Sequence, residues 1–386
     1  MAGKLKILEV CNLDRFAASP YMLPFLRKLV ERGNEVHVAC RVTSFADILR
    51  EAGLEVHDIP ITRSITPMRD ITCYRRLKSL IREGGYDLVH SHNPKDGVMG
   101  RMAAWKLTVP AVIHTCNGFY FSHRSSGLKR WAVLRAERFA AKRCHLIIFV
   151  NSDDLALAAA KKVVKPGRAK LIYNGVDLER FTPGEEPALS QELSIPEDAT
   201  VIGYIGEIRR ERNLDVLVEA AAALRRREAE GEGARPHLHL VMVGDHSLEP
   251  KEPERLERLA SRLGMEGRLH FTGYRRDPER FYRIFTVYAL PSTREGFGVT
   301  LIEAMASEVP VVACRVRGPR DIIDDGLDGI LVADRDSSEL ADAVSFLLET
   351  PEAVRAYTER AREKVARDFN HKRMRSQLLN EYRRLT

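Results

Sequence analysis

The sequence has no hydrophobic run long enough to cross a bilayer, which takes roughly 20 apolar residues in a helix. Its longest clear apolar run, Leu146 to Val150, has only the length of a strand. The first residues do not resemble a secretory signal, because Lys4 and Lys6 lead into only about five apolar-leaning residues before Asp14. We therefore expect a cytoplasmic protein, whose only membrane contact would be peripheral, at the inner face of the membrane.

Cysteines and aromatic side chains are few. The six cysteines include no Cys-x-x-Cys pair and lie mostly in or beside apolar runs, as expected of reduced core thiols rather than disulfides or metal ligands. Aromatic residues make up 7% of the chain and form no platform among its basic residues, and there is no zinc-finger or RNA-recognition motif. The sequence therefore predicts no nucleic-acid partner.

Positive charge, in contrast, is in excess, with a formal net charge of +7. An excess of this size is consistent with an anionic small substrate or with an anionic membrane surface. Without a spanning segment, membrane contact would be reversible binding to anionic lipid that weakens as salt rises. We expect peripheral contact of this kind, which would bring the protein to a lipid-linked acceptor.

The length of 386 residues and a hydrophobic share of 44% predict a soluble protein of about two domains. In the first half, short apolar runs alternate with helix-period segments such as 21–32, 70–83, 97–107 and 128–142, which predicts a parallel sheet covered on both faces. The strands predicted for this half are Leu5–Cys11, Glu35–Arg41, Glu55–Ile61, Asp87–His92, Ala111–Cys116, His145–Asn151 and Lys170–Asn174.

A polar stretch with prolines, from Thr182 to about Ala199, interrupts the alternation as a linker would. The alternation then resumes with predicted strands at 201–207, 237–245, 268–274, 287–290, 310–315 and 329–332. We therefore predict an α/β protein with two Rossmann-like domains. Their predicted bounds are 1–182 for the acceptor-side domain, 183–199 for the linker, 200–368 for the nucleotide-sugar domain and 369–386 for a terminal helix.

Residues 291–313 combine the groups that would bind a nucleotide sugar. They predict the end of a buried strand, a turn, a helix and another buried strand. Gly296 and Gly298 let the backbone approach a ligand closely, and the helix start that follows favours an anion. Glu295 precedes this helix start, and Glu303 lies eight positions later, on the helix. A nucleotide sugar presents its sugar hydroxyls, diphosphate and ribose diol in the same order.

This stretch resembles the donor-binding signature of retaining glycosyltransferases with the two-Rossmann GT-B architecture, in particular glycosyltransferase family 4. In that family two glutamates with seven residues between them lie in this context, and Glu295 and Glu303 have that spacing. The resemblance covers nearly the whole chain and implies a cleft between the domains and a final helix that crosses back to the first. Other segments similar to the family, in the expected order, are 90–97, 173–181, 206–214 and 271–274.

The resemblance implies a retaining enzyme that moves a hexosyl or N-acetylhexosaminyl group from a UDP- or GDP-sugar to a glycolipid, polysaccharide or other hydroxyl acceptor. Glu295 would be catalytic, accepting hydrogen bonds from donor-sugar hydroxyls, and Glu303 would accept them from the ribose diol. Arginines would hold the diphosphate, because their forked donors match phosphate oxygens. The other donor-binding residues implied are Arg209, Arg212, Tyr274, Gly296, Phe297, Gly298 and Val299.

The sequence departs from the family at two places. The family commonly has Arg directly after the loop glycine and Lys five residues further on, where this chain has Glu207 and Arg212. Arg212 keeps the charge, and Arg209 can substitute for the missing arginine, whereas Arg210 fits a solvated face equally well. The family also often has a His at the reacting centre, where this chain has Asn117. An amide can bind a sugar or phosphate but cannot act as a general base, and Asn before Gly is also a common turn former.

The acceptor-side candidates are Asp14, His92 and His123. His123 fits a surface position as well, and one histidine of the pair His90 and His92 is expected to be a satisfied core residue. No Asp-x-Asp pair stands where a metal would bridge the diphosphate, and a helix dipole with arginines can replace a cation. We therefore expect no metal and no cofactor beyond the nucleotide-sugar co-substrate.

Two other functions remain open. A nucleotide-sugar 2-epimerase of the same architecture would act at the sugar C2 and turn over without an acceptor. The alternative outside the enzymes is a non-catalytic sugar-nucleotide-binding subunit. Glu207 and Asn117 favour this alternative, because they depart from the family pattern.

Overall fold

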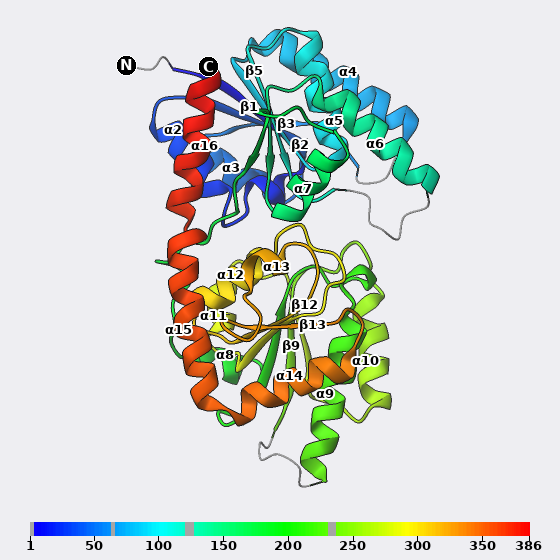
Figure 1. Cartoon of the computed structure of the whole chain (residues 1–386), viewed down its shortest axis with the longest axis vertical. Coiled ribbons are helices and arrows are strands. Elements are labelled where there is room, and N and C mark those ends of the chain that lie inside the picture. Colours follow the sequence, from blue (N-terminus) through cyan, green and yellow to red (C-terminus); the bar gives the residue numbers. More distant parts are fainter. Residues whose placement is uncertain (1–3, 63–65, 120–126, 231–236) are drawn as a thin grey trace. The chain divides into compact units, whose positions relative to one another are not determined.

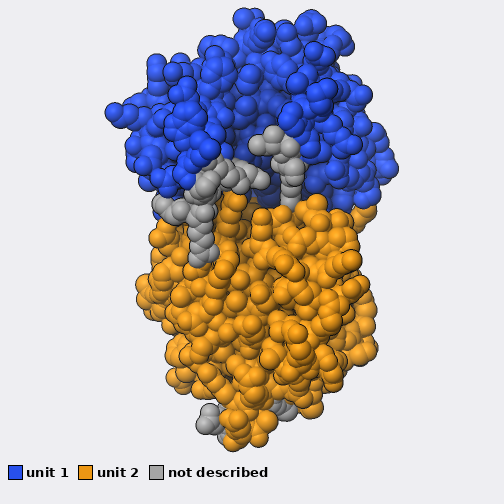
Figure 2. Space-filling view, turned by 90° about the vertical axis from the view of Figure 1, so that its right-hand side faces the viewer, with its two compact units in different colours: residues 1–174, 371–386 blue, residues 175–370 orange. Residues whose placement is uncertain are grey.

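The computed structural model describes residues 4–62, 66–119, 127–230 and 237–386. The chain divides into two compact units, Met1–Asn174 with His371–Thr386, and Gly175–Asn370 (Figure 2). Each unit is built on one sheet whose paired strands are all parallel, as the alternation of strands and helices predicts (Figure 1). The predicted fold class, an α/β protein with two Rossmann-like units, is therefore confirmed.

Unit 1 has a seven-stranded sheet in the order β3-β2-β1-β4-β5-β6-β7. The central strands are buried along their whole length, so helices must cover both faces. Helices α2, α3 and α16 pack on one face, and α4, α5, α6 and α7 pack on the other (Figure 1). The strands are β1 (Lys6–Leu13), β2 (Glu35–Arg41), β3 (Glu55–Asp58), β4 (Leu88–His92), β5 (Ala111–Cys116), β6 (Leu146–Phe149) and β7 (Ala169–Leu171). The helices are α1 (Asp14–Ala17), α2 (Leu23–Glu31), α3 (Ala46–Glu51), α4 (Pro67–Gly84), α5 (Pro94–Lys106), α6 (Gly127–Ala141), α7 (Ser152–Ala160) and α16 (His371–Leu385).

Unit 2 has a six-stranded sheet in the order β10-β9-β8-β11-β12-β13. Helix α9 packs against α10 and α14, and α12 packs against α15. The strands are β8 (Val201–Ile205), β9 (His239–Val243), β10 (Leu269–Gly273), β11 (Val287–Leu290), β12 (Val311–Cys314) and β13 (Ile330–Val332). The helices are α8 (Pro187–Glu192), the short η1 (Arg210–Arg212), α9 (Leu214–Ala229), α10 (Glu252–Arg262), α11 (Pro278–Tyr282), α12 (Val299–Ala306), α13 (Pro319–Ile322), α14 (Ser337–Glu349) and α15 (Pro351–Asp368).

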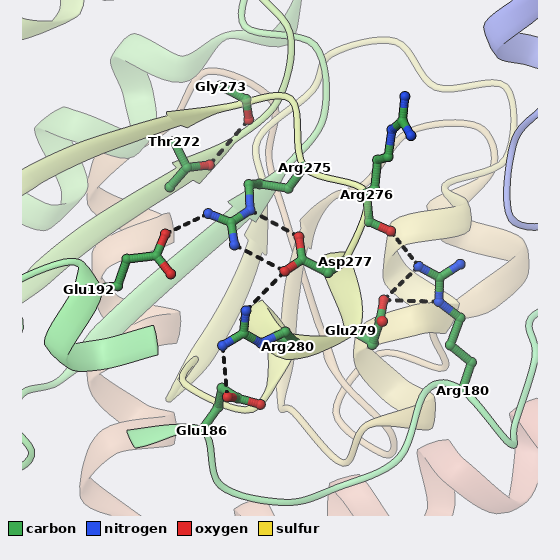
Figure 3. Close-up of polar contacts among 10 residues, drawn as sticks. All are labelled: Arg180, Glu186, Glu192, Thr272, Gly273, Arg275, Arg276, Asp277, Glu279 and Arg280. Carbon is green, nitrogen blue, oxygen red and sulfur yellow. Dashed lines mark hydrogen bonds and ion pairs between the residues drawn. The ribbon is translucent and has the colours of Figure 1, made fainter. Parts of the chain in front are cut away.

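The boundary between the units lies at residues 174 and 175, before the boundary at 182 that the sequence predicts. Ion pairs hold the following segment to the start of α11 (Figure 3). Arg180 pairs with Glu279 at 2.7 Å, and Glu186 pairs with Arg280 at 2.9 Å. The stretch 183–199, expected to be a linker, therefore belongs to unit 2 and contains α8. Its polar composition reflects these ion pairs.

The final helix, α16, belongs to unit 1 because its apolar face and one tyrosine are buried there. The Tyr382 hydroxyl donates a hydrogen bond to Glu9 Oε1 at 2.8 Å and lies 2.6 Å from His90 Nδ1. Glu9 and His90 come from the neighbouring strands β1 and β4. The packing of the last helix on the first Rossmann-like unit therefore rests on a buried polar cluster as well as on apolar contacts.

Two expectations from composition are met in the structure. All six cysteines are buried and none forms a disulfide. Among the described residues, no helix is both long enough and apolar enough to span a membrane.

Candidate functional site

The candidate site of unit 2 lies where the strand order of its sheet reverses, between β8 and β11. In open α/β sheets, ligands bind at the carboxyl ends of the strands on either side of such a point. The loop 206–213 follows β8, and the loop 291–298 follows β11. The two loops touch, because the Asn213 side-chain amide donates to the Pro291 carbonyl at 3.3 Å. This arrangement brings the two segments that carry the predicted donor-binding residues to one place.

Arg212 and Glu295 form an ion pair across these loops. The Arg212 guanidinium also lies 3.9 Å from Glu207, and Arg209 lies 3.3 Å from Glu207. The nearby Glu295 carboxylate raises the pKa of Arg212, so its charge is secure at any physiological pH. Two arginines and two glutamates thus alternate at the switch point, and Glu211, which pairs with Arg209 at 2.8 Å, adds a third acid.

Arg212 keeps a donor that this cluster does not use. Its Nε atom is buried and has no hydrogen-bond acceptor in the described parts of the chain, whereas the Arg209 Nε lies 3.3 Å from the Glu207 carboxylate. A buried donor without a partner is costly, so the Arg212 Nε–H is available to an anionic ligand. The side chain of the neighbouring Arg210, in contrast, is 74% exposed and lies 3.7 Å from Glu252. Arg209 and Arg212 therefore lie at the switch point where the phosphate role is predicted, and Arg210 has the solvated position that the sequence left open.

The start of helix α12 is positioned by glycines. Gly298 precedes the helix with a φ of 105°, which is costly for other residues. A Cβ on Gly318 would lie 2.3 Å from the Phe297 carbonyl oxygen, so a glycine there lets the two backbones approach. The Phe297 side chain is buried against Phe369, with ring centroids 5.6 Å apart. Phe297 could therefore contribute to a ligand site through its backbone, together with the backbones of Gly296, Gly298 and Val299.

Glu303 is the fifth residue of α12 and is only 5% exposed. The Tyr282 hydroxyl donates a hydrogen bond to its carboxylate at 2.9 Å. Burial nevertheless raises the pKa of Glu303 to about 7, because the charged form is poorly solvated there. Glu303 is therefore partly protonated at neutral pH in the empty protein. A ligand diol would provide donors to the charged form and lower this pKa again.

Tyr274, the residue expected to face the base, follows β10 at the edge of the same sheet and is exposed. The neighbouring Arg275 is tied down by Asp277 at 2.9 Å and by Glu192 at 2.7 Å (Figure 3). Tyr274 thus stands beside a rigid, ion-paired segment. In the sheet, β9 lies between β10 and the strand before the Arg212 loop, and β9 and β8 lie between β10 and the strand before the Glu295 loop.

In unit 1, Asn117 follows β5 in a turn where Gly118 has a φ of 116°. Its side-chain nitrogen is buried and has no hydrogen-bond partner within the described residues. A residue that only formed the turn would satisfy its amide locally. The unpaired Asn117 amide favours a ligand contact. The left-handed conformation of Gly118 shows that Asn117 also stands in a tight turn.

The acceptor-side candidates differ in environment. Asp14 is fully buried, and its carboxylate accepts hydrogen bonds from the backbone of Arg15 and from Thr43 and Phe45, so it has a structural task in holding the loop after β2. His92 is buried, with Nε2 2.7 Å from Glu9, and its Nδ1 has no partner among the described residues. Burial lowers the pKa of His92 to about 4, so it is neutral. His123 lies outside the described residues.

Two groups of side chains in unit 1 have the composition of a metal site among the residues described: Glu9 with His90 and His92, and His37 with Glu55 and His57. In the first group Glu9 already accepts from Tyr382 and His92. Neither group contains a residue predicted to hold the diphosphate. The absence of a metal requirement stays a prediction.

Two site residues are absent from the sequence predictions: Tyr282, which donates to Glu303, and Glu9, which lies beside His92. Glu9 left a signal, since it is the one charged residue within the apolar run Ile7–Cys11 and must therefore be paired. The sequence carries no comparable signal for Tyr282, because a tyrosine in a short helix after a polar loop is typical of ordinary core packing.

Comparison with known families matches both units. Residues 185–364 match the family described as glycosyl transferases group 1, and residues 18–180 match glycosyltransferase family 4. EpsD of Bacillus subtilis, named as a glycosyltransferase, is 30% identical over 385 residues, which cover 98% of this chain and 96% of that protein. A D-inositol 3-phosphate glycosyltransferase of Saccharomonospora viridis is 34% identical over 321 residues, with 80% of this chain and 72% of that protein covered.

Solved structures with similar folds cover nearly the whole chain. Anabaena HepE in complex with UDP and glucose has a TM-score of 0.82 at 20% identity, with 98% of this chain and 99% of that chain covered. Sucrose-phosphate synthase from Thermosynechococcus elongatus has a TM-score of 0.81 at 23% identity, with 99% of each chain covered. At these identities the likeness establishes the fold.

Proposed function

The chain belongs to the group 1 glycosyltransferases with the GT-B fold, and from this premise we propose that it is a retaining enzyme that uses a UDP- or GDP-linked sugar. The group transferred would be a hexose or an N-acetylhexosamine. The acceptor would be a hydroxyl of a glycolipid or polysaccharide. The observation that carries the proposal is the Arg212 guanidinium at the switch point of unit 2, which pairs with Glu295 and has a buried Nε–H without an acceptor among the described residues.

Donor binding would exchange the partners of this pair. Arg212 would turn its unpaired Nε–H to the diphosphate, Arg209 would exchange its contact with Glu207 for the diphosphate, and the N-terminus of α12 would add backbone donors. Glu295, released from Arg212, would accept hydrogen bonds from the donor-sugar hydroxyls. These contacts stabilise the charge that develops on the leaving diphosphate, which is how fixed donors lower a barrier.

Glu303 would accept hydrogen bonds from the ribose diol, and Tyr274 would face the base. Asn117 would donate its unpaired amide to the donor sugar or its phosphate. Because an amide cannot accept the acceptor's proton, the departing phosphate would take it, consistent with retention of configuration. No metal is needed in this scheme, since the arginines and the helix start supply the positive field.

HepE, a structural neighbour, has been crystallised with UDP and with UDP-glucose, which supports a nucleotide-sugar donor for the fold. The relatives are named as glycosyltransferases, some of them as D-inositol 3-phosphate glycosyltransferases. We also propose that the enzyme works in the cytoplasm, with peripheral contact at an anionic membrane where a lipid-linked acceptor is found.

A panel of UDP- and GDP-sugars, incubated with the full-length protein, tests the proposal through release of nucleoside diphosphate. At least one donor should be hydrolysed slowly without acceptor, and Glu295→Ala should abolish most of this turnover. Binding of a nucleotide sugar without release of nucleoside diphosphate would favour the non-catalytic subunit. The acidic Glu207 beside the arginines is the feature consistent with that alternative. Conversion to the 2-epimer without acceptor would favour the epimerase.

A further inference from the structure

The outer face of helices α4 and α6 in unit 1 carries apolar side chains that folded proteins usually bury. On α6, Leu128 is 78% exposed, Trp131 57% and Phe139 46%. Met68 and Ile71 on α4 are also exposed. Six of the ten large exposed hydrophobic side chains of the described residues lie on α4, α5 and α6, so the exposure is concentrated on one region.

The exposed residues of α6 lie along one side of the helix. Leu128, Trp131, Arg135 and Phe139 follow one another at intervals of three or four positions, which places them in a single stripe, and the half-buried Arg143 follows just after the end of the helix. The Arg135 guanidinium lies over the Trp131 ring at 5.1 Å, and Arg143 lies over the Phe139 ring at 3.5 Å. The stripe thus combines apolar rings with cations stacked on them.

The charge along α6 has one sign. Residues 127–143 contain six lysines and arginines and a single acid, a net charge of +5 (6 − 1). That acid, Glu137, is buried and pairs with Arg101 at 2.9 Å, so it does not offset the outer face. The outer face of α6 is therefore basic and apolar at once.

Helix α4 extends this surface. Helix α5 contacts both α4 and α6, and the three lie on the same face of the sheet (Figure 1). Beyond Met68 and Ile71, α4 exposes Arg75, Arg76 and Arg82. The same combination of apolar and basic side chains thus occurs on both helices that flank α5.

We propose that this face, formed by the exposed residues of α4 and α6, binds the surface of an anionic lipid bilayer. Tryptophan, phenylalanine and leucine would enter the headgroup region, and the arginines would contact lipid phosphates while their stems cover apolar surface. A soluble polyanion would pair with the arginines but would leave the apolar stripe in water. The inference rests on the membrane part of the proposed function and names the surface responsible.

Tryptophan fluorescence tests the insertion directly, because the chain has only two tryptophans. In the full-length Trp105→Phe variant, Trp131 is the only one left. Its emission should shift to the blue with vesicles containing phosphatidylglycerol, and brominated lipid should quench it. Vesicles of phosphatidylcholine alone should give no shift. Binding to anionic vesicles without a shift would overturn the proposed orientation.

Pairs of variants distinguish binding through this face from nonspecific attraction between the positively charged protein and anionic vesicles. Arg135→Gln/Lys142→Gln should weaken vesicle binding about 30-fold, from the typical contribution of each basic residue near an anionic surface. Leu128→Ser/Phe139→Ser should weaken it as well. Arg355→Gln/Arg360→Gln on α15 and Phe346→Ser on α14 are the matched controls, since they remove exposed charge or apolar surface in unit 2.

Equal losses in the variants and their controls would overturn the proposal. The proposal would also be overturned if heparin bound as tightly as the vesicles and the Trp131 emission did not shift. Self-association of the protein that disappears in the α6 variants would overturn it too, because the face would then bind a second copy. Release of nucleoside diphosphate from the donor in solution should be unchanged in all of them. Failure of membrane binding is therefore distinguishable from failure of the proposed donor chemistry.

Discussion

Replacing Glu303 by glutamine should have opposite effects on stability and on nucleotide binding. The carboxyl is buried, hydrogen-bonded by Tyr282, and has a pKa raised from 4.5 to about 7. The folded protein therefore binds this proton more tightly than the unfolded chain. The stability that the proton contributes is fully present below about pH 4.5 and is lost as pH rises through about 7.

The size of the effect follows from the shift. A difference of about 2.5 units corresponds to about 3 kcal/mol of free energy of unfolding above pH 8. Glutamine resembles the protonated acid and still accepts from Tyr282, so Glu303→Gln should match the wild type at pH 5. At pH 8 its unfolding transition should be higher by about 6–12 °C, the shift expected for a domain of this size.

Nucleotide binding should change in the other direction. A hydrogen bond to a charged group contributes about 1.5–3 kcal/mol, so Glu303→Gln should bind the nucleoside diphosphate about 10- to 100-fold more weakly at pH 8. Calorimetric unfolding and titration at pH 5 and 8 measure both quantities. Glu308→Gln is the control, because Glu308 is 40% exposed and its removal relieves no buried charge.

The reasoning is refuted if Glu303→Gln loses stability equally at both pH values, since the carboxylate would then be a favourable charge in the empty protein. It is also refuted for the ribose contact if nucleotide affinity at pH 8 equals that of the wild type.

The remaining predictions concern the reacting centre and the metal. Asn117→Ala should lower kcat about 10- to 100-fold with little change in nucleotide affinity, because the proposed nucleotide contacts come from unit 2. Lowered thermal stability with unchanged kcat would assign Asn117 to the turn alone. Asn117→His should keep part of the activity if the pocket accepts an imidazole. Turnover should survive EDTA, and complete loss in chelator with recovery in Mg²⁺ or Mn²⁺ would contradict the metal-free scheme.

Much of the fold follows from the sequence because parallel strands are buried on both faces and so appear as continuous apolar runs. Each of the thirteen strands of the described residues overlaps a predicted one, and their bounds agree to within three residues. No helix was named at α3 or α7; α3 has only six residues, and α7 is rich in alanine, so neither shows a clear apolar periodicity. The boundary predicted near 182 falls between the two family matches, whereas the contacts divide at 174 and 175, because ion pairs such as Glu186 with Arg280 pack the polar segment onto unit 2.

The sequence predicted individual residues of the candidate site but not the contacts between them. Spacing and resemblance indicated Glu295, Glu303 and Arg212. Spacing carries no information on the pairing of Arg212 with Glu295, on the Tyr282 hydroxyl beside Glu303, or on the Glu9 carboxylate that orients His92. These contacts join residues 21 to 83 positions apart, and only the folded sheet brings them together.

The most direct test of the central claim is the affinity of the full-length protein for UDP and GDP in EDTA, measured by titration calorimetry. The wild type should bind one of the two. Arg212→Ala should weaken that binding about 10- to 100-fold, and Arg210→Ala, three residues from Glu207 in the same loop and largely exposed, should leave it unchanged. No binding of either nucleotide, or equal losses in the two variants, would contradict the assignment of the diphosphate to the arginines at the switch point of unit 2.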